Sequence, residues 1–150
     1  MLKSINCENL GPLDAVEWPN LDKINLVIGN NASGKTFLLK ALYCAVKTIE
    51  STGRGDNPLK SDEILAEKLY WTFQPGKAGL GELVTKGTNF LKMNLEGSKR
   101  GSKLLFQFGP STDKKIGTME NTFAKREQNS IFLPAKEVLS ISSKKVGILT

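Results

Sequence analysis

The sequence predicts an α/β fold with an α+β tendency: a central sheet, the helix that follows a glycine-rich loop, and an antiparallel β-subdomain. Two observations lead to this prediction. An apolar run at 24–28 enters the loop GNNASGKT at 29–36, and an apolar stripe with helical spacing begins directly after the loop. Further along, apolar residues alternate with a period of two, as in strands that bury one face. We expect a single domain over residues 1–150.

Three strands are predicted before the first helix. Residues 1–8 alternate imperfectly and residues 15–18 form a second short run, with Gly11-Pro12 as the turn between them, which favours an antiparallel pair. The run INLVI at 24–28 is short, apolar and rich in β-branched residues. It therefore predicts a buried strand at the centre of the sheet.

Two helices are predicted in the middle of the chain. The first runs from Lys35 to about Thr52-Gly53, and the second, after a loop at 51–60, is capped by Ser61 and stopped by Pro75-Gly76. The apolar stripe of the first helix consists of Leu38, Ala41, Leu42, Ala45, Val46 and Ile49. The second helix places Leu65, Leu69 and Phe73 on one face.

The rest of the chain is predicted to be antiparallel. Alternating residues at 91–95 and 104–108 form a hairpin around a turn at 97–101. Further strands are expected at 116–122 and at 130–133, the last one ended by Pro134.

Composition narrows the function classes. The charged fraction of 24% is typical of globular proteins, and neither a secretory signal nor an apolar stretch near the roughly 20 residues of a membrane span is evident, so we expect a cytoplasmic protein. The sequence contains no histidine, which excludes serine-histidine and cysteine-histidine catalysis and disfavours a zinc site. The only two cysteines, Cys7 and Cys44, are expected in the core.

The net charge of +6 suits a polyanionic partner, and DNA is a possible one. The basic residues are dispersed, however, so a solvated face is favoured over a nucleic-acid track. The groups considered are Lys99, Arg100 and Lys103; Lys114 and Lys115; Lys125 and Arg126; and Lys144 and Lys145.

The loop GNNASGKT matches G-x-x-x-x-G-K-[ST] at every specified position, between a predicted strand and a predicted helix. Backbone N–H groups in such a loop curl around a phosphate, and the helix directs its positive end at the same anion. The pattern predicts binding of ATP with Mg²⁺, Lys35 reaching the β- and γ-phosphates as the catalytic cation and the Thr36 hydroxyl coordinating the metal. The predicted nucleotide-binding residues are Gly29, Asn30, Asn31, Ala32, Ser33, Gly34, Lys35, Thr36 and Phe37.

Several segments together resemble a known family. The opening MLKSI, the triplet ENL at 8–10 and the stretch 24–36 resemble the start of ABC-type ATPases of the RecF and structural-maintenance-of-chromosomes (SMC) kind. Residues 131–140 resemble a segment of bacterial AAA-type ATPases related to the overcoming-lysogenization-defect nucleases and to phage-defence ATPases. The resemblance implies a P-loop NTPase N-terminal lobe, part of a longer ATPase domain, in which ATP joins two protomers for DNA repair, chromosome handling or phage defence.

The sequence departs from that family in its catalytic parts. No aspartate follows a run of four apolar residues as in a Walker B strand, no LSGGQ-like signature is present, and Gln74, Gln107 and Gln128 receive no role. We therefore do not expect the chain alone to hydrolyse ATP. Lys136 and Glu137 are interpreted as a surface ion pair or helix start rather than as neighbours of the γ-phosphate. Trp18 is interpreted as a core or rim residue rather than an adenine contact.

Two alternatives to an ABC-type lobe stay open. One is an ATP-sensing or scaffold module that does not turn nucleotide over, which the absent Walker B aspartate favours. The other is a P-loop small-molecule kinase, which needs an arginine-rich lid. The chain has only three dispersed arginines, Arg54, Arg100 and Arg126, and no N-K-x-D element that would indicate a GTPase.

Overall fold

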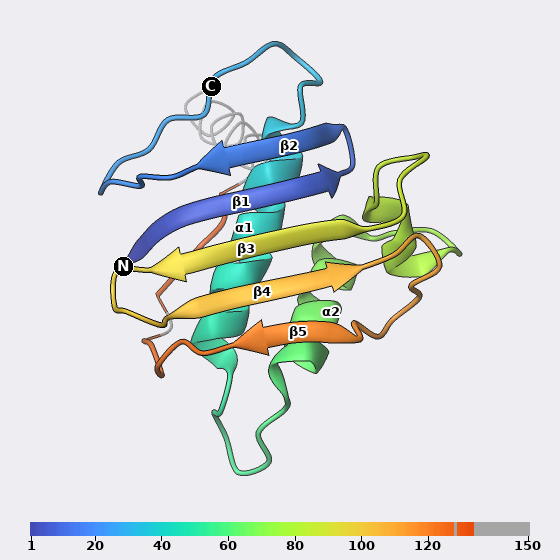
Figure 1. The fold of residues 1–150 in the computed structure, drawn as a ribbon. Helices are drawn as coiled ribbons and strands as arrows, with labels where there is room; N and C mark the ends of the chain where they lie inside the picture. Colours follow the sequence, from blue (N-terminus) through green and yellow to red (C-terminus); the bar gives the residue numbers. More distant parts are fainter. Residues whose placement is uncertain (128, 134–150) are drawn as a thin grey trace, which may run out of the picture.

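In a computed structural model that describes residues 1–127 and 129–133, a five-stranded antiparallel sheet carries two α-helices on one face (Figure 1). The strand order is β2-β1-β3-β4-β5. The strands are β1 (Leu2–Leu10), β2 (Leu13–Trp18), β3 (Leu91–Gly97), β4 (Lys103–Phe108) and β5 (Thr118–Asn121). The helices are α1 (Lys35–Ser51) and α2 (Ser61–Phe73), followed by a short 3₁₀ helix, η1 (Gly79–Leu83). The sheet and helices agree with the predicted α/β fold and its α+β tendency.

The first hairpin confirms the predicted antiparallel pair. Strands β1 and β2 pair from Ile5↔Trp18 to Leu10↔Leu13, and the turn includes Gly11 at φ 54°. A Cβ atom at Gly11 would lie 2.5 Å from Cε1 of the Phe37 ring. The turn is thus packed directly against the start of α1.

The second hairpin, β3–β4, supplies most of the sheet's buried face. Met93 pairs with Phe106 and Leu95 with Leu104, and all four side chains are buried against the helices, as their alternation predicts. Strand β5 occupies part of the predicted 116–122 strand. The strand predicted at 130–133 is wrong, because residues 130–133 are not in a strand.

Helix α1 lies across the sheet and buries Leu38, Ala41, Ala45 and Ile49 of the predicted stripe, whereas Leu42 and Val46 stay partly exposed. Cys44 and Thr48 are buried with them. Burial raises the pKa of the Cys7 thiol to about 12 and that of Cys44 to about 11. Both thiols are therefore protonated at neutral pH and serve as core residues, as expected.

Helix α2 corrects one detail of the prediction. It ends at Phe73, before Pro75, but its N-cap is Lys60 rather than Ser61. The Glu63 carboxylate accepts a hydrogen bond from the Lys60 backbone N–H at 3.1 Å, which satisfies the helix start from within its first turn. The Ser61 hydroxyl instead accepts from Asn121 Nδ2 at 3.0 Å and thereby connects α2 to β5.

The predicted buried strand at 24–28 is wrong for the described chain. Ile24, Leu26 and Ile28 are 90%, 77% and 83% exposed, and the segment is not paired with any of the five strands. A strand is stable only where neighbouring backbone accepts and donates its hydrogen bonds. Locally, Asn25 instead closes a turn with Asp22, its side chain bonding the Asp22 backbone N–H at 2.9 Å and the carbonyl at 2.7 Å.

Within the described residues, no helix is both long and apolar enough to cross a membrane.

Candidate phosphate-binding site

The loop at 29–36 lies between the exposed 24–28 segment and the first turn of α1. Gly34, the N-cap of α1, has φ 88°, a conformation that strains any L-residue. A Cβ atom at Gly34 would also lie 2.8 Å from Leu13 Cδ2 and 3.0 Å from Pro12 Cγ. Both its dihedral angle and the close approach of the β1–β2 turn therefore require glycine at this position.

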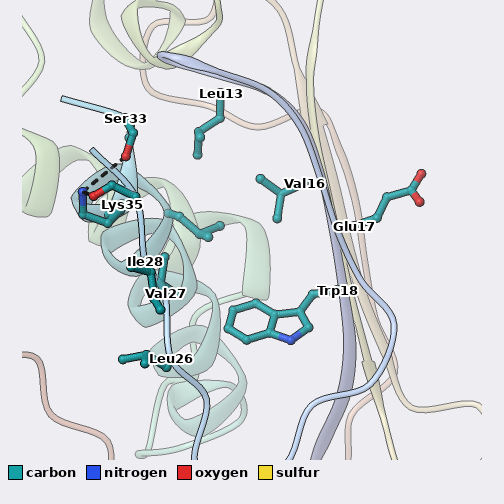
Figure 2. A pocket seen from close by; sticks show the side chains of 12 residues that line it. Leu13, Val16, Glu17, Trp18, Leu26, Val27, Ile28, Ser33 and Lys35 are labelled. Atoms are coloured by element: carbon teal, nitrogen blue, oxygen red, sulfur yellow. Dashed lines mark hydrogen bonds between the residues drawn. The ribbon is translucent and has the colours of Figure 1, made fainter. Parts of the chain in front are cut away.

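The Lys35 side chain folds back over the loop. Its ammonium donates to the carbonyl oxygens of Gly29 at 2.6 Å and Asn30 at 2.5 Å, and its Nζ lies 3.3 Å from the Ser33 hydroxyl (Figure 2). All three partners are neutral, and Lys35 is in no ion pair within the described residues. The loop therefore presents a positive charge that no carboxylate of the described chain compensates.

The start of α1 adds backbone donors beside this ammonium. The Leu38 N–H is the first intrahelical donor and bonds the Gly34 carbonyl at 3.0 Å, so the N–H groups of Lys35, Thr36 and Phe37 precede it and have no acceptor within the helix. No acidic residue lies in the first turn to compete for the positive end of the helix. This geometry is suited to binding an anion.

A pocket of about 470 Å³ extends from the loop along the inner side of β2 (Figure 2). Val16 and Trp18 of β2 project into it, opposite Leu26, while Glu17 points to the other side of the strand. This volume is within the roughly 300–1,000 Å³ that is usual for small-molecule sites. The pocket thus joins an apolar chamber to the positively charged loop.

The structure brings part of the predicted site together. Gly29, Ser33, Gly34 and Lys35 line the pocket and Asn30 supplies a carbonyl to Lys35, whereas Asn31, Ala32 and Thr36 are exposed beside it. The Phe37 ring packs on Phe73, with ring centroids 5.1 Å apart, so only its backbone is available to a ligand.

Trp18 was expected in the core or at the rim, and it occupies the rim: it is partly buried, packs on the core and also lines the pocket. The sequence signal for this rim position is that Trp18 is an aromatic residue at the end of a strand.

Carboxylates and glutamines are sparse at the site. Glu17 is the only acidic residue that lines the pocket, and no group of three or more histidine, cysteine, aspartate or glutamate side chains suited to a metal occurs in the described chain. Gln74 is the C-cap residue that follows α2 and Gln107 lies on β4, both outside the pocket lining. Gln128, Lys136 and Glu137 lie outside the described residues.

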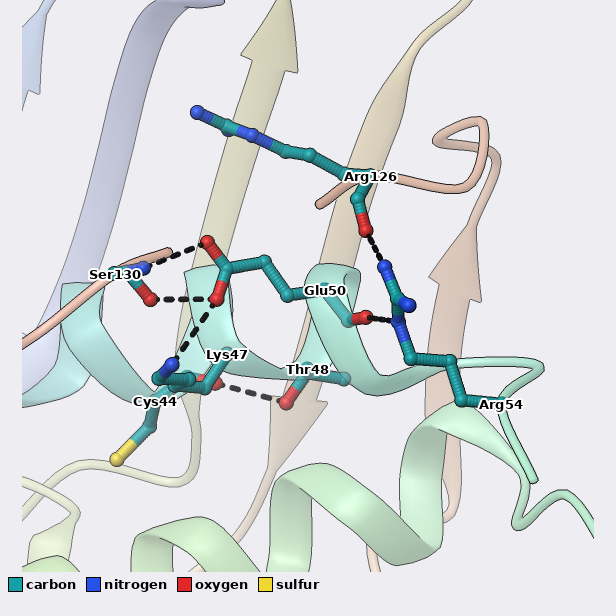
Figure 3. Close-up of polar contacts among 7 residues, drawn as sticks. All are labelled: Cys44, Lys47, Thr48, Glu50, Arg54, Arg126 and Ser130. Carbon is teal, nitrogen blue, oxygen red and sulfur yellow. Dashed lines mark hydrogen bonds and ion pairs between the residues drawn. The ribbon is translucent and has the colours of Figure 1, made fainter. Parts of the chain in front are cut away.

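A second polar cluster closes the opposite end of α1 (Figure 3). The Glu50 carboxylate is fully buried and accepts hydrogen bonds from the Ser130 N–H at 3.2 Å and the Ser130 hydroxyl at 2.7 Å. Lys47 lies 3.3 Å from the same carboxylate. Arg54 donates to the carbonyls of Glu50 and Arg126.

These contacts decide the protonation state of Glu50. Burial alone raises the pKa of its carboxyl. The hydrogen bonds from Ser130 and the hydrogen bond and charge of Lys47 lower the pKa by more than burial raises it, so that the pKa lies below its ordinary value of 4.5. Glu50 is thus ionised at neutral pH and fully engaged with its own chain.

The fold is an antiparallel sheet covered by two helices, and the first helix starts directly after the loop GNNASGKT. No known protein family and no curated protein matches the sequence.

Among solved structures, the chain is similar to the recombination mediator protein RecF with ATP, from the RecFOR pathway, at 21% identity and a TM-score of 0.46, over 79% of this chain and 27% of that one. It is also similar to a structure from a study of ATP-driven dimerization and DNA-stimulated activation of SMC ATPases, at 11% identity and a TM-score of 0.47, over 95% of this chain and 77% of that one. Both TM-scores are below 0.5, so the loop residues alone carry the functional assignment.

Proposed function

We propose that this chain binds ATP with Mg²⁺ through residues 29–36, as the nucleotide-binding lobe of an ABC-type ATPase. The observation that carries the proposal is the Lys35 ammonium, held by neutral oxygens beside the start of α1. A fixed cation and free N–H groups at a helix start both attract a multiply charged phosphate. A triphosphate supplies enough oxygens for both.

Each loop residue has a role in this proposal. The backbone N–H groups of residues 32–36 surround the phosphates, and Lys35 moves its donors from the loop carbonyls to the β- and γ-phosphate oxygens. Thr36, exposed at the first turn of α1, offers its hydroxyl to Mg²⁺. One hydroxyl fits this metal, which keeps several waters and is bound mainly by substrate phosphates.

Trp18 completes the proposed site on its apolar side. It lines the same pocket as Lys35, and its indole offers a flat aromatic surface on which a nucleobase can stack. The base would then occupy the chamber between β2 and Leu26 while the phosphates occupy the loop. No charged side chain projects into that chamber from β2, which suits an uncharged base.

By its resemblance to the RecF and SMC family, the complete domain would couple ATP binding and hydrolysis to dimerisation in DNA repair, chromosome handling or phage defence. A Walker B aspartate and a signature helix would then come from elsewhere in the domain. Ligand contacts to both protomers stabilise a dimer by mass action.

One observation favours a second function, an ATP-sensing or scaffold module without turnover. Among the described residues the only carboxylate lining the pocket is Glu17, which points away from the cavity. Nothing there activates a water molecule for attack on the γ-phosphate.

Calorimetry of ATP binding with and without Mg²⁺, followed by phosphate release in the same sample, tests both functions. We expect magnesium-dependent binding with no release above the buffer blank. Binding with turnover would point to an acidic residue outside the described part of the chain. Absence of binding by the folded chain would refute the proposed site.

Tryptophan fluorescence tests the position of the base. Trp18 and Trp71 are the only tryptophans, and Trp71 is 67% exposed on α2, so a Trp71→Phe variant reports Trp18 alone. ATP should quench this emission, whereas inorganic triphosphate should bind with little quenching. Equal quenching by both ligands would contradict base stacking on Trp18.

A further inference from the structure

Basic side chains gather at the end of the sheet formed by the β3–β4 turn. Two adjoining hollows share Gly97, Ser98, Lys99 and Ser102. Six basic residues line them, namely Lys3, Lys99, Arg100, Lys103, Lys125 and Arg126, and we call this surface the basic turn patch. The fold therefore unites two basic groups that are dispersed in the sequence and adds Lys3.

Backbone contacts hold the three parts of the basic turn patch together. Ser98 N–H donates to the Met1 carbonyl at 2.8 Å, which joins the turn to the start of β1. The chain after β5 packs on the same turn, since a Cβ atom at Gly97 would lie 2.7 Å from Cε1 of Phe123. Lys125 and Arg126 follow Phe123 after one residue, Ala124. The fold thus brings together the three chain segments that carry these cations.

Charge in the patch is poorly compensated. Its two carboxylates are Glu96 and Glu120, and Glu120 forms an ion pair with Lys103 at 3.3 Å. The five other basic side chains have no ion pair among residues 1–127 and 129–133. The Arg126 carbonyl accepts a hydrogen bond from Arg54, and Figure 3 draws no contact between the Arg126 guanidinium and Glu50. Six cations against two anions account for most of the chain's net charge of +6.

We propose that the basic turn patch binds the phosphodiester backbone of a nucleic acid. Lysine and arginine side chains on both sides of a turn match an anion whose charges repeat along its length. The hydroxyls of Ser98 and Ser102 in the hollows add neutral donors that phosphate oxygens accept.

The lining of the patch disfavours a membrane surface. Of the large apolar side chains that are exposed in the described chain, only Met1 belongs to the patch. Interfacial membrane binding requires buried apolar anchors in addition to charge. A nucleic-acid backbone requires none.

The patch is separate from the phosphate loop. Lys3, the second residue of β1, belongs to the patch, and the strand ends at the turn that packs on Gly34, a distance of about 25–30 Å for a strand of this length. The inference consequently does not depend on the proposed ATP site, and nucleic-acid binding can be measured without nucleotide.

Fluorescence anisotropy with a labelled 20-nucleotide single strand, titrated at several salt concentrations, tests the proposal on the whole chain. The patch variant Lys99→Ala/Arg100→Ala/Lys125→Ala is compared with Lys77→Ala/Lys86→Ala/Lys115→Ala, which removes the same charge from exposed positions outside the patch. We expect the patch variant to bind at least about tenfold more weakly and its log–log salt slope to fall by about 2, since each phosphate contact contributes about 0.7.

The control variant should lose no more than about threefold through its changed net charge. Circular dichroism and ATP calorimetry establish that both variants fold alike and keep the loop intact. Equal losses in the two variants, or patch-dependent binding to phosphatidylserine vesicles without binding to the oligonucleotide, would overturn the proposal.

Discussion

The two ends of helix α1 differ in how their charges are used. At the first turn, Lys35 rests on neutral loop oxygens and is partly exposed, with free backbone donors around it. About four turns later, Glu50 is fully buried and accepts hydrogen bonds from Ser130 as well as contacting Lys47. At the first end the Lys35 charge is available to a ligand. At the other end the Glu50 charge is bonded to other parts of the same chain.

This difference teaches that a charged residue at a helix end is informative only with its partners. The positive charge of Lys35 still attracts an anion, because the oxygens that accept its hydrogen bonds carry no charge. Glu50 has its partners within the chain, so a ligand would have to displace buried hydrogen bonds to reach it. The predictions below change one end at a time.

The largest effect is expected at the open end. Lys35→Ala should remove measurable ATP binding in calorimetry, a loss on the order of 100-fold, because a charged hydrogen bond contributes about 1.5–3 kcal/mol and 1.4 kcal/mol is tenfold. Lys40→Ala, on the same helix, is the matched control and should bind normally. Unchanged affinity in folded Lys35→Ala would refute the role of this lysine.

The closed end should respond in stability and not in binding. Glu50→Ala is expected to lower the free energy of unfolding by about 2–3 kcal/mol, because the N–H and hydroxyl of the half-buried Ser130 lose a charged acceptor. Urea denaturation followed by circular dichroism measures this loss. Glu63→Ala, a matched change at an exposed carboxylate that accepts only the Lys60 N–H, should cost about 1 kcal/mol. Equal losses would show that burial of Glu50 has no special weight.

The pH dependence isolates the charge of Glu50. Its pKa is lowered on folding, so its stabilising contribution is complete above about its ordinary value of 4.5 and disappears as pH falls through the lower folded pKa. Relative to Glu50→Gln, the wild-type chain should be more stable by about 1.5 kcal/mol at pH 7. This advantage should vanish at low pH; a constant difference from pH 7 to pH 3 would contradict the assignment.

The smallest effect concerns the metal at the open end. Thr36→Ala should weaken ATP binding about tenfold in the presence of Mg²⁺, roughly the 1.4 kcal/mol of one lost ligand contact, and much less in EDTA. Thr36→Ser keeps the hydroxyl and should bind ATP in the presence of Mg²⁺ as tightly as the wild-type chain. Equal losses with and without Mg²⁺ would mean that Thr36 does not contact the metal.

The elements that sequence patterns predict correctly are those fixed by local periodicity. The spacing from Leu38 to Ile49 defines α1, and alternation at 91–95 and 104–108 defines the β3–β4 hairpin, because each pattern has a single face to bury. The motif at 29–36 likewise places Lys35 at a helix start without any tertiary information.

Contacts between distant segments could not be predicted in this way. Glu50 and Ser130 are 80 residues apart, and no local pattern signals that a glutamate in a helix will be buried by a serine that far along. Residues 24–28 read as a core strand by composition, yet a strand also needs a neighbour, and the described sheet ends at β2 and β5. The N-cap of α2 is mispredicted because Ser61, next to the actual N-cap Lys60, is on average the better N-cap residue. The hydrogen bond from the Lys60 N–H to Glu63 has no comparably strong signal in the sequence.

The exposed segment at 24–28 also affects how the chain behaves in solution. Ile24, Leu26 and Ile28 present three large alternate apolar side chains, on a stretch with no charge and no proline to prevent strand pairing. Two copies that meet along this stretch could pair edge to edge and shield both from water. We therefore expect this chain to self-associate as its concentration rises. Added sulfate should strengthen this self-association, and Leu26→Lys should suppress it.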